Sequence, residues 1–382
     1  MTGAQLTFYD TSRAYYAGYY LQGFDELAKN GKLQIRVAHA LPARLKSAIQ
    51  DADWQHLLFA MALFRFQQGG YEWYFCIDTH DSNSVDVTHH TGGYHLPLLH
   101  SVDVYFKVNY NPDQIESTPV LKDSSEKIFS ISQFFPIRPS AFLSLSRRML
   151  LTPRLFGFKP GINYNAPYKN HFTDAKFRLR DLKNYQPLEQ ILAYRATPKD
   201  IDIFFVTSFR HNSRHVEVME HRDQVIKKLS SIASLKTATG FSSEKALPEK
   251  YAKVIYPRLN QVDYLETLAR AKVVIYTQGI AGCLSSKFGL AMALGVAVIG
   301  EPLGNNPDLL IANPHLKEQF SYSDPDEIVG RAVDLVTNPE QARRLGALNA
   351  HMFDNQLAPC PTAEYILQVL QKFQFSDSQY SC

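Results

Sequence analysis

The chain has 382 residues, enough for two domains with apolar cores of their own. Its 40 basic and 37 acidic residues give a net charge of +3, too small to predict nucleic-acid binding from bulk charge. Four scattered cysteines fit neither a paired metal motif nor a disulfide framework, so a reducing cytoplasm is expected. The N-terminus has no signal-peptide pattern and no apolar run reaches roughly 18 residues, which excludes standard export and an integral membrane protein.

Short β-rich runs alternate with helical patterns along the chain, which predicts an α/β fold built on parallel sheets. The first half contains six expected strands. Several of them end in polar residues, and open α/β sheets place ligands at that end. The expected strands cover residues 5–10, 33–39, 56–66, 71–78, 103–110 and 128–135.

Residues 138–183 form a basic segment rich in Pro, Tyr and Phe. Its cations lie among apolar residues, so it is a candidate for peripheral contact with an anionic membrane. The alternative is an inter-domain segment with solvated charges. A boundary is expected between residues 185 and 200, and the predicted domains are 1–190 and 191–360, followed by a helix that crosses back and a tail at 361–382.

The second half opens with a strand at 201–206 that is almost continuously apolar, as expected where helices cover both faces of a sheet. A helix follows, with apolar residues at helical spacing from Val218 to Ile232. Asp324 and Asn338, each followed by Pro, predict the starts of two later helices. A C-terminal amphipathic helix is expected around residues 366–373.

The stretch "GIAGCLSSKFGLAMALGVAVIGEPL" begins after a buried strand. Gly279 and Gly282 allow a tight turn with a bare backbone, and Ser285 or Ser286 can cap the helix that follows. The positive end of that helix would then leave the carboxyl edge of the sheet, where anions bind. Lys287 in the first turn is disfavoured by the helix dipole unless an anion offsets it. The alternative is an ordinary Gly-rich turn with a surface lysine.

Three basic side chains follow the first strand of this half, namely Arg210, His211 and Arg214. Because carboxyl ends of parallel strands meet at one edge, they should lie near the start of the helix at Ser286. Arginine suits bidentate contacts to phosphate. The alternative is a solvated basic loop.

In this order of elements, residues 199–375 resemble the second domain of GT-B glycosyltransferases. The motifs that carry the resemblance are "YLETLARAKVVIYTQG", the Gly/Ser turn and "ALGVAVIG"; in the first half, "YDTSRAYYAGYYLQGFDELA" is similar to the family's first strand, loop and helix. The resemblance implies a GT-B fold of two Rossmann-like domains facing across a cleft. It also implies a nucleotide sugar held mostly by the second domain and an acceptor held by the first. The donor-binding residues would be Arg210, Arg214, Gly282, Ser285, Ser286, Lys287 and Glu301.

One departure from the family concerns two glutamates that retaining members usually carry around this helix. Here the first place matches Lys287 and the second falls on Ala291 or Met292, which puts a retaining mechanism in doubt. Glu301 could supply a displaced acidic contact; the alternative is an ordinary loop residue.

An inverting transfer needs a base for the acceptor hydroxyl. Asp78, at the end of a buried strand, is the first choice and Asp81 the second; Asp10 is a third carboxylate worth testing. The alternative is that Asp78 and Asp81 only cap the turn. Lys107 and Asn109 lie on the same predicted edge and are candidates for substrate contact.

A histidine-rich stretch could suggest a metal site, but its spacing matches no standard zinc motif, so no metal is expected. A histidine could instead contact the acceptor or act as the base. The histidines are His89, His90, His95 and His100.

The sequence therefore predicts a metal-independent glycosyltransferase of polysaccharide biosynthesis. It would move a sugar from a nucleotide-diphosphate sugar to a glycan or lipid-linked acceptor, with no other cofactor. One alternative is a sugar-nucleotide epimerase of the same fold. The other is a non-catalytic glycan-binding or scaffold protein.

Overall fold

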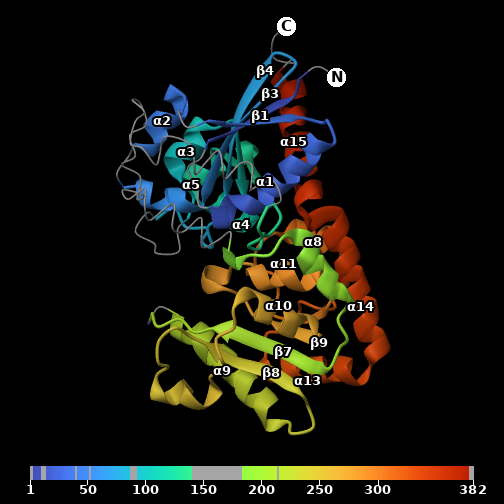
Figure 1. Ribbon diagram of the computed structural model, residues 1–382. Helices are drawn as coiled ribbons and strands as arrows, with labels where there is room; N and C mark the ends of the chain where they lie inside the picture. Colours follow the sequence, from blue (N-terminus) through green and yellow to red (C-terminus); the bar gives the residue numbers. More distant parts are fainter. Residues whose placement is uncertain are drawn as a thin grey trace. The chain divides into compact units, whose positions relative to one another are not determined.

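The computed structural model describes residues 3–9, 14–38, 41–50, 53–86, 93–139, 183–212 and 215–377 (Figure 1). Residues 140–182, most of the basic segment at 138–183, lie outside the described residues. The chain divides into two compact units. Unit 1 comprises Met1–Pro187 together with Gln356–Cys382, and unit 2 comprises Leu188–Asn355.

Unit 1 is built on a six-stranded sheet in the order β2-β1-β3-β4-β5-β6. Its strands are β1 (Gln5–Tyr9), β2 (Gln34–Ala38), β3 (Met61–Gln68), β4 (Tyr71–Asp78), β5 (Val104–Lys107) and β6 (Ile128–Ser130). Its helices are α1 (Ala14–Lys29), α2 (Ala43–Ile49), η1 (Gln55–Ala60), α3 (Leu96–Ser101), α4 (Pro112–Ser117), α5 (Pro119–Lys122), η2 (Ser125–Lys127) and α15 (Pro359–Asp377). All six strands expected in the first half are present.

One strand of this sheet corrects the expectation of parallel pairing, because β3 is antiparallel to both β1 and β4. Gln68 pairs with Tyr71, so only Gly69 and Gly70 connect the two strands. Both glycines have positive φ, at 60° and 89°, as a two-residue hairpin turn requires. The expected strand at 56–66 also starts later, because η1 occupies its first residues.

The two faces of the unit 1 sheet carry different side chains, as the pleat dictates. On one face Phe64 stacks on Phe75 at 4.8 Å between ring centroids, and Phe24 of α1 packs on both rings. Cys76 and Tyr105 point to the other face and share a core with α2 and α3. Carboxyl ends of β1, β4 and β5 meet at one edge, because these strands run in the same direction.

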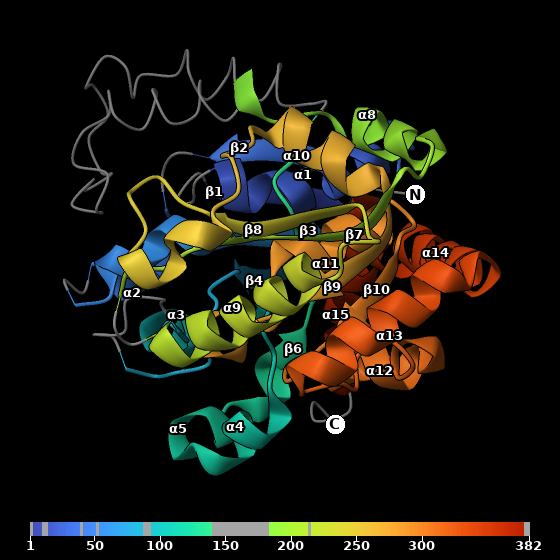
Figure 2. The same cartoon turned by 90° about the horizontal axis from the view of Figure 1, so that it is seen from below.

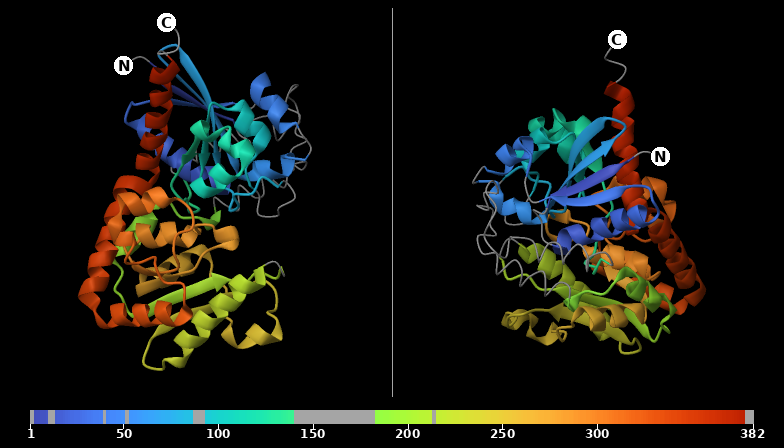
Figure 3. Two further views of the ribbon diagram at one scale, coloured as in Figure 1. Left: turned by 180° about the vertical axis from the view of Figure 1, so that it is seen from behind. Right: turned by 45° about the horizontal axis from the view of Figure 1, so that its top comes forward.

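The C-terminal helix α15 lies beside α1 within unit 1 (Figure 3). The contact is close at Gly23, where an added Cβ would lie 1.9 Å from the carbonyl oxygen of Pro359. Tyr19 donates a hydrogen bond to the Leu357 carbonyl oxygen over 2.6 Å, just before α15 begins. Glycine at residue 23 therefore permits the docking of the C-terminal helix.

Unit 2 has a four-stranded, fully parallel sheet in the order β10-β9-β7-β8 (Figure 2). The strands are β7 (Ile201–Ser208), β8 (Thr237–Ser242), β9 (Ala271–Tyr276) and β10 (Ala297–Gly300). The helical elements are α8 (Leu188–Ala193), η3 (Tyr194–Ala196), α9 (Val216–Ser231), η5 (Glu249–Val254), α10 (Gln261–Ala269), η6 (Ile280–Gly282), α11 (Ser286–Ala293), α12 (Pro307–Ala312), η7 (Pro314–Leu316), α13 (Pro325–Thr337) and α14 (Pro339–Met352), with a π-helical turn, η8 (Phe353–Leu357), at the boundary between the units. Sequence analysis missed β8, whose "TATGFS" has little apolar content.

The strand order of unit 2 creates a switch point between β7 and β9. The chain leaves β7 through α9 toward β8 on one side, and leaves β9 through α11 toward β10 on the other. In open α/β sheets the loops diverge at such a point, and ligands bind there at the carboxyl edge. The fold class is thus α/β, as predicted, and unit 2 has one topologically favoured ligand position.

Helix starts in unit 2 follow the predicted capping chemistry. Asp324 accepts hydrogen bonds from the backbone N–H groups of Asp326 and Glu327, and Asn338 accepts one from Gln341. Gly295, with φ of 62°, follows the last turn of α11 as expected. Across the described residues of the whole chain, no helix combines the length and apolar character needed to cross a membrane.

We predict that Gly23→Ala destabilises the protein by about 1–3 kcal/mol, because the new methyl group must displace backbone atoms of Pro359. The control is Gly330→Ala in the interior of α13, where nothing lies within 4 Å of an added Cβ. That change should stabilise the protein by about 0.5–1 kcal/mol through helix propensity. Urea denaturation measures both. Equal effects of the two substitutions would contradict the packing argument.

Candidate functional site

The switch point of unit 2 is occupied by the guanidinium group of Arg222, which comes from α9. Its Nη1 donates to the carbonyl oxygen of Ser208 at the end of β7, over 3.4 Å. Its Nε donates to Oγ1 of Thr277 over 3.1 Å and its Nη2 to the carbonyl oxygen of Gln278 over 2.8 Å. One side chain therefore ties together the two loops that diverge after β7 and β9.

Arg222 is buried, with 7% of its surface exposed, yet all three of its acceptors are neutral. It forms no salt bridge with any residue in the described part of the chain. Burying a cation without a carboxylate is costly, so the position favours an anion that is supplied from outside. Burial lowers the pKa of Arg222. The nearby Glu301 carboxylate acts against this shift, and the charge of Arg210 adds to it.

Lys287, in the first turn of α11, is the third cation at this edge. Its residue keeps some exposed surface, but the ammonium nitrogen lies over the ring of Phe205, 5.0 Å from the centroid. Burial, together with the charge of Arg222, lowers the pKa of Lys287 to about 7. A negatively charged ligand would reverse that shift, because it would favour the protonated ammonium.

The loop before α11 depends on glycine at two positions. An added Cβ on Gly279 would lie 2.2 Å from Sγ of Cys283, and Gly282 has φ of 69°. Ala281 also adopts a left-handed conformation, with φ of 58°, which is unusual for a residue with a side chain. The chain thereby turns sharply into α11, whose N-cap residue, Ser285, makes no side-chain cap hydrogen bond. The N–H of Phe288 already donates to the Ser285 carbonyl oxygen, so the N–H groups that this helix start can offer a ligand are those of Ser286 and Lys287.

Among the predicted donor-binding residues, the structure places Arg210, Gly282, Ser285, Ser286 and Lys287 on loops and a helix start at the carboxyl edge of this sheet. Arg214 lies outside the described residues.

Glu301 follows β10 at the same edge. Its Oε2 accepts a hydrogen bond from the backbone N–H of Gln278 over 2.6 Å, and its Oε1 lies 3.6 Å from Nε2 of His221. This carboxylate therefore holds the loop after β9 in the present geometry. A contact to ribose or sugar remains a prediction.

Sequence reasoning missed Arg222. It lies on the apolar face of a helix between Met219 and Val225, both buried. An arginine on such a face is the signal that could have found it, since a cation is retained there only with a specific partner or ligand.

The carboxyl edge of the unit 1 sheet holds a buried polar cluster around Asp78. Oδ1 of Asp78 accepts from the backbone N–H of His80 over 2.8 Å and lies 2.7 Å from its Nδ1. Oδ2 accepts from the Tyr105 hydroxyl over 2.6 Å and from Nζ of Lys107 over 3.0 Å. Burial alone would raise the pKa of Asp78, but the charge of Lys107 and the hydrogen bonds from His80 and Tyr105 outweigh it and hold that pKa below its usual range.

These contacts determine the tautomer of His80. An ionised carboxylate can only accept, so Nδ1 of His80 carries a proton and donates it to Asp78. In the neutral ring, Nε2 is then the unprotonated nitrogen. Nε2 is buried and has no hydrogen-bond partner in the part of the chain that the structure describes. The arrangement is that of a base oriented by a carboxylate.

The other predicted residues of unit 1 divide into three groups. Lys107 and Asn109 are fully buried, and both donate to the carbonyl oxygen of His80 over 3.2 Å, so they support the cluster from within. Asp81 lies half-buried in the bend after β4. Of the histidines, His95 is buried and His100 is exposed at the end of α3. Asp10, His89 and His90 lie outside the described residues.

No family model and no curated protein matches the chain. Solved structures of similar fold include a TarM mutant from Staphylococcus aureus in complex with fondaparinux, α-GlcNAc-glycerol and UDP, at 15% identity and a TM-score of 0.42. That match covers 77% of this chain and 50% of the TarM chain, so the chain spans half the length of that structure. UDP-GlcNAc 2-epimerase from Neisseria meningitidis bound to UDP-GlcNAc is 11% identical with a TM-score of 0.39, covering 93% of this chain and 90% of that one.

A glycosyltransferase from Rickettsia africae is 11% identical with a TM-score of 0.34, covering 91% of this chain and 87% of that chain. Glycosyltransferases and UDP-GlcNAc 2-epimerases are therefore among the solved structures of similar fold.

We predict that Lys107→Met lowers the free energy of unfolding by about 3–5 kcal/mol at pH 7, because Asp78 is left buried without its cation. The pKa of Asp78 is depressed in the folded state, so this contribution is present above about pH 4 and is lost as the pH falls below it. Urea denaturation at pH 7 and pH 3 measures both effects. The double variant Asp78→Leu/Lys107→Met is the control, because it removes both charges and should recover part of the loss. A single variant as stable as the wild type would refute the role of the pair.

Proposed function

We propose that the protein is a glycosyltransferase that moves a sugar from a nucleotide-diphosphate sugar to a hydroxyl of a glycan or lipid-linked acceptor. The observation that carries the proposal is the buried guanidinium of Arg222 at the switch point, with Lys287 and Arg210 at the same edge and no carboxylate bound to Arg222. Two phosphates would supply the missing negative charge. The start of α11 would add N–H donors to the same anion.

In this reaction unit 2 stabilises the leaving group. The bond between the anomeric carbon and the diphosphate oxygen breaks, and the electron pair stays on the diphosphate. Arg222 and Lys287 face that developing charge and are already in place before the reaction, so little reorganisation is needed. The depressed pKa of Lys287 means that donor binding at neutral pH also takes up a proton.

In unit 1 the base that we propose is Nε2 of His80. It would accept the proton of the acceptor hydroxyl while the hydroxyl oxygen forms the new bond to the anomeric carbon. Asp78 holds the opposite nitrogen and stabilises the imidazolium ion that results. Both oxygens of Asp78 already accept two donors each, which favours a role for this carboxylate through His80 rather than as the base itself. The assignment of the base to Asp78 or Asp81 stays a prediction.

We predict that Lys287→Ala weakens binding of nucleoside diphosphates, measured by titration calorimetry, by about 1.5–3 kcal/mol, the loss of a charge-assisted hydrogen bond. In the wild type the free amine has a pKa of about 7 and the bound amine a higher one. Affinity should therefore fall as the pH rises above 7, by up to about tenfold per pH unit. This pH dependence should be absent in the variant.

The control for this experiment is Lys317→Ala, which removes an exposed lysine of the same unit. It should leave both the affinity and its pH dependence unchanged. If Lys287→Ala binds nucleoside diphosphates as tightly as the wild type, or if no nucleoside diphosphate binds the wild type, the donor site does not exist.

We predict that His80→Asn lowers kcat/KM about 10²- to 10⁴-fold, the usual contribution of a general base, with nucleotide affinity unchanged. Asparagine retains a donor for Asp78 and lacks the second nitrogen. His100→Asn, at an exposed histidine of α3, should be as active as the wild type.

Product analysis in the same assay separates transfer from epimerisation, which converts the donor without an acceptor. Full activity of His80→Asn would return the role of base to Asp78 or Asp81.

A further inference from the structure

Three buried polar atoms beside the Asp78 cluster have no hydrogen-bond partner among the described residues. They are Nε2 of His80, Nε2 of His95 and the hydroxyl of Tyr94. Their residues are at most 2% exposed. A buried polar group without a partner is rare in native proteins and calls for a ligand or ordered water. Two of them, the ring nitrogens of His80 and His95, belong to residues that Asp78 and Tyr105 join in one hydrogen-bonded network.

The two imidazole rings present opposite hydrogen-bonding character. Nδ1 of His95 accepts from the backbone N–H of Leu98 over 3.2 Å, so the proton of this neutral ring resides on Nε2. Burial lowers the pKa of His95 to about 3, which keeps the ring neutral. His95 therefore offers a donor, whereas Nε2 of His80 offers an acceptor.

Tyr105 connects the two rings. Its hydroxyl donates to Asp78, which holds His80, and accepts from the backbone N–H of His95 over 3.0 Å. The donor and the acceptor therefore belong to one hydrogen-bonded network rather than to separate parts of the unit.

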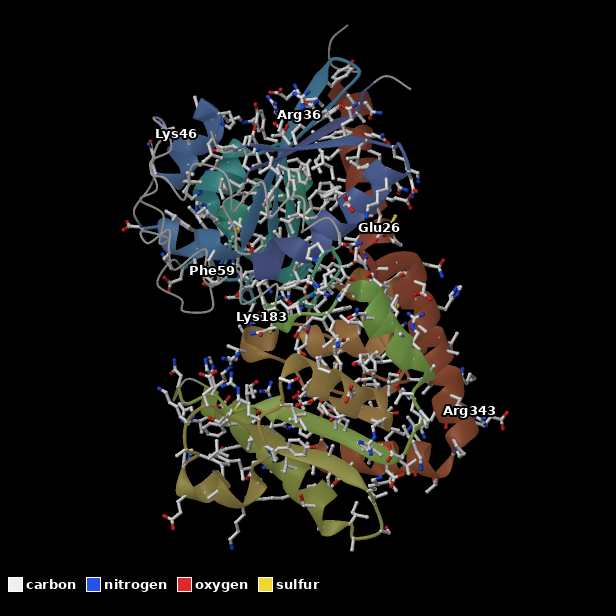
Figure 4. All side chains as sticks on the ribbon, in the orientation of Figure 1. Glu26, Arg36, Lys46, Phe59, Lys183 and Arg343 are labelled. Carbon is white, nitrogen blue, oxygen red and sulfur yellow. The ribbon has the colours of Figure 1, made fainter. Side chains whose placement is uncertain are left out.

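Partly exposed aromatic rings lie beside both imidazoles. The ring of Phe59, labelled in Figure 4, lies 5.3 Å from that of His80, and Tyr16 lies 5.4 Å from Phe59. Trp54 lies 5.4 Å from His95. Rings of this kind provide apolar faces next to polar groups, a combination that suits the alternating C–H and O–H groups of a sugar.

The charge of the cluster restricts the ligand further. Asp78 and Lys107 already neutralise each other at 3.0 Å, and the three unpartnered atoms belong to neutral groups. An anionic or cationic ligand would find no free counter-charge within this network. The donor of His95, the acceptor of His80 and the hydroxyl of Tyr94 are the groups that can hydrogen-bond to the hydroxyl groups of a neutral polyol.

We propose that this site of unit 1 binds the acceptor as a neutral sugar. One hydroxyl of the sugar donates to Nε2 of His80, and a hydroxyl oxygen of the sugar accepts from Nε2–H of His95. The sugar ring packs on Trp54 or Phe59. The role of this site as the acceptor site rests on the proposed function. Sugar binding itself can be measured whether or not the protein transfers a sugar. His95 is a binding residue here and takes no proton.

The test uses the full chain and ligand-observed NMR with neutral disaccharides: maltose, cellobiose, lactose and N,N′-diacetylchitobiose. 3′-Sialyllactose is the anionic counterpart of lactose. At least one neutral disaccharide should bind, and sialyllactose should bind more weakly than lactose. His95→Asn retains an oxygen that can cap α3 but removes the Nε2–H donor, so it should weaken sugar binding at least fivefold. His100→Asn, on the same helix, should leave it unchanged.

A second variant, Trp54→Leu, tests the same site if His95→Asn does not fold. It should also weaken sugar binding at least fivefold. The proposal is overturned if no neutral disaccharide binds, if sialyllactose binds best, or if folded variants bind as the wild type does. Nucleoside diphosphate affinity, measured in parallel, should be the same in all variants. If the wild type binds no nucleoside diphosphate but does bind a neutral disaccharide, the donor site is refuted and the sugar site stands. Failure of the proposed function and failure of the sugar site are therefore distinguishable.

Discussion

The donor site that we propose depends on one buried guanidinium. Arg222 reaches from α9 to the switch point of the unit 2 sheet and satisfies backbone carbonyl groups of both diverging loops. Those hydrogen bonds position the loops after β7 and β9, but their acceptors are neutral, so among the described residues no carboxylate is bonded to the guanidinium. Burial, together with the charge of Arg222, lowers the pKa of Lys287. The same interaction that organises the loops therefore prepares the site for an anion.

In unit 1, by contrast, the buried charges compensate each other. Asp78 and Lys107 are buried side by side on neighbouring parallel strands, and each compensates the other. The unpartnered atoms beside this pair are hydrogen-bonding groups, and Asp78 holds the neutral ring of His80 in a single tautomer. The electrostatics of the two units are consistent with the transfer that we propose, in which the donor is charged and the acceptor is uncharged.

Local patterns predicted much of the fold. The expected strands, the helix starts at Asp324 and Asn338, and the α/β class follow from short-range alternation of apolar and polar residues. The pairing of β3 did not follow, although "GG" between two apolar runs is a hairpin signal. Lys287 was identified because its charge conflicts with the helix dipole, a conflict that is visible within one turn.

The sequence by itself determined most of the strands and helices and several of the polar residues at the carboxyl edges of the sheets, because periodicity and capping act over a few residues. Only the tertiary structure decided what those polar residues do. In the sequence Arg222 is one cation of an amphipathic helix, and its role follows only from the pairing of β9 with β7. In the sequence Asp78 is a candidate base, whereas in the structure Tyr105 and Lys107 donate to one of its oxygens. Burial and long-range hydrogen bonds set charge and tautomer, and neither is encoded in local spacing.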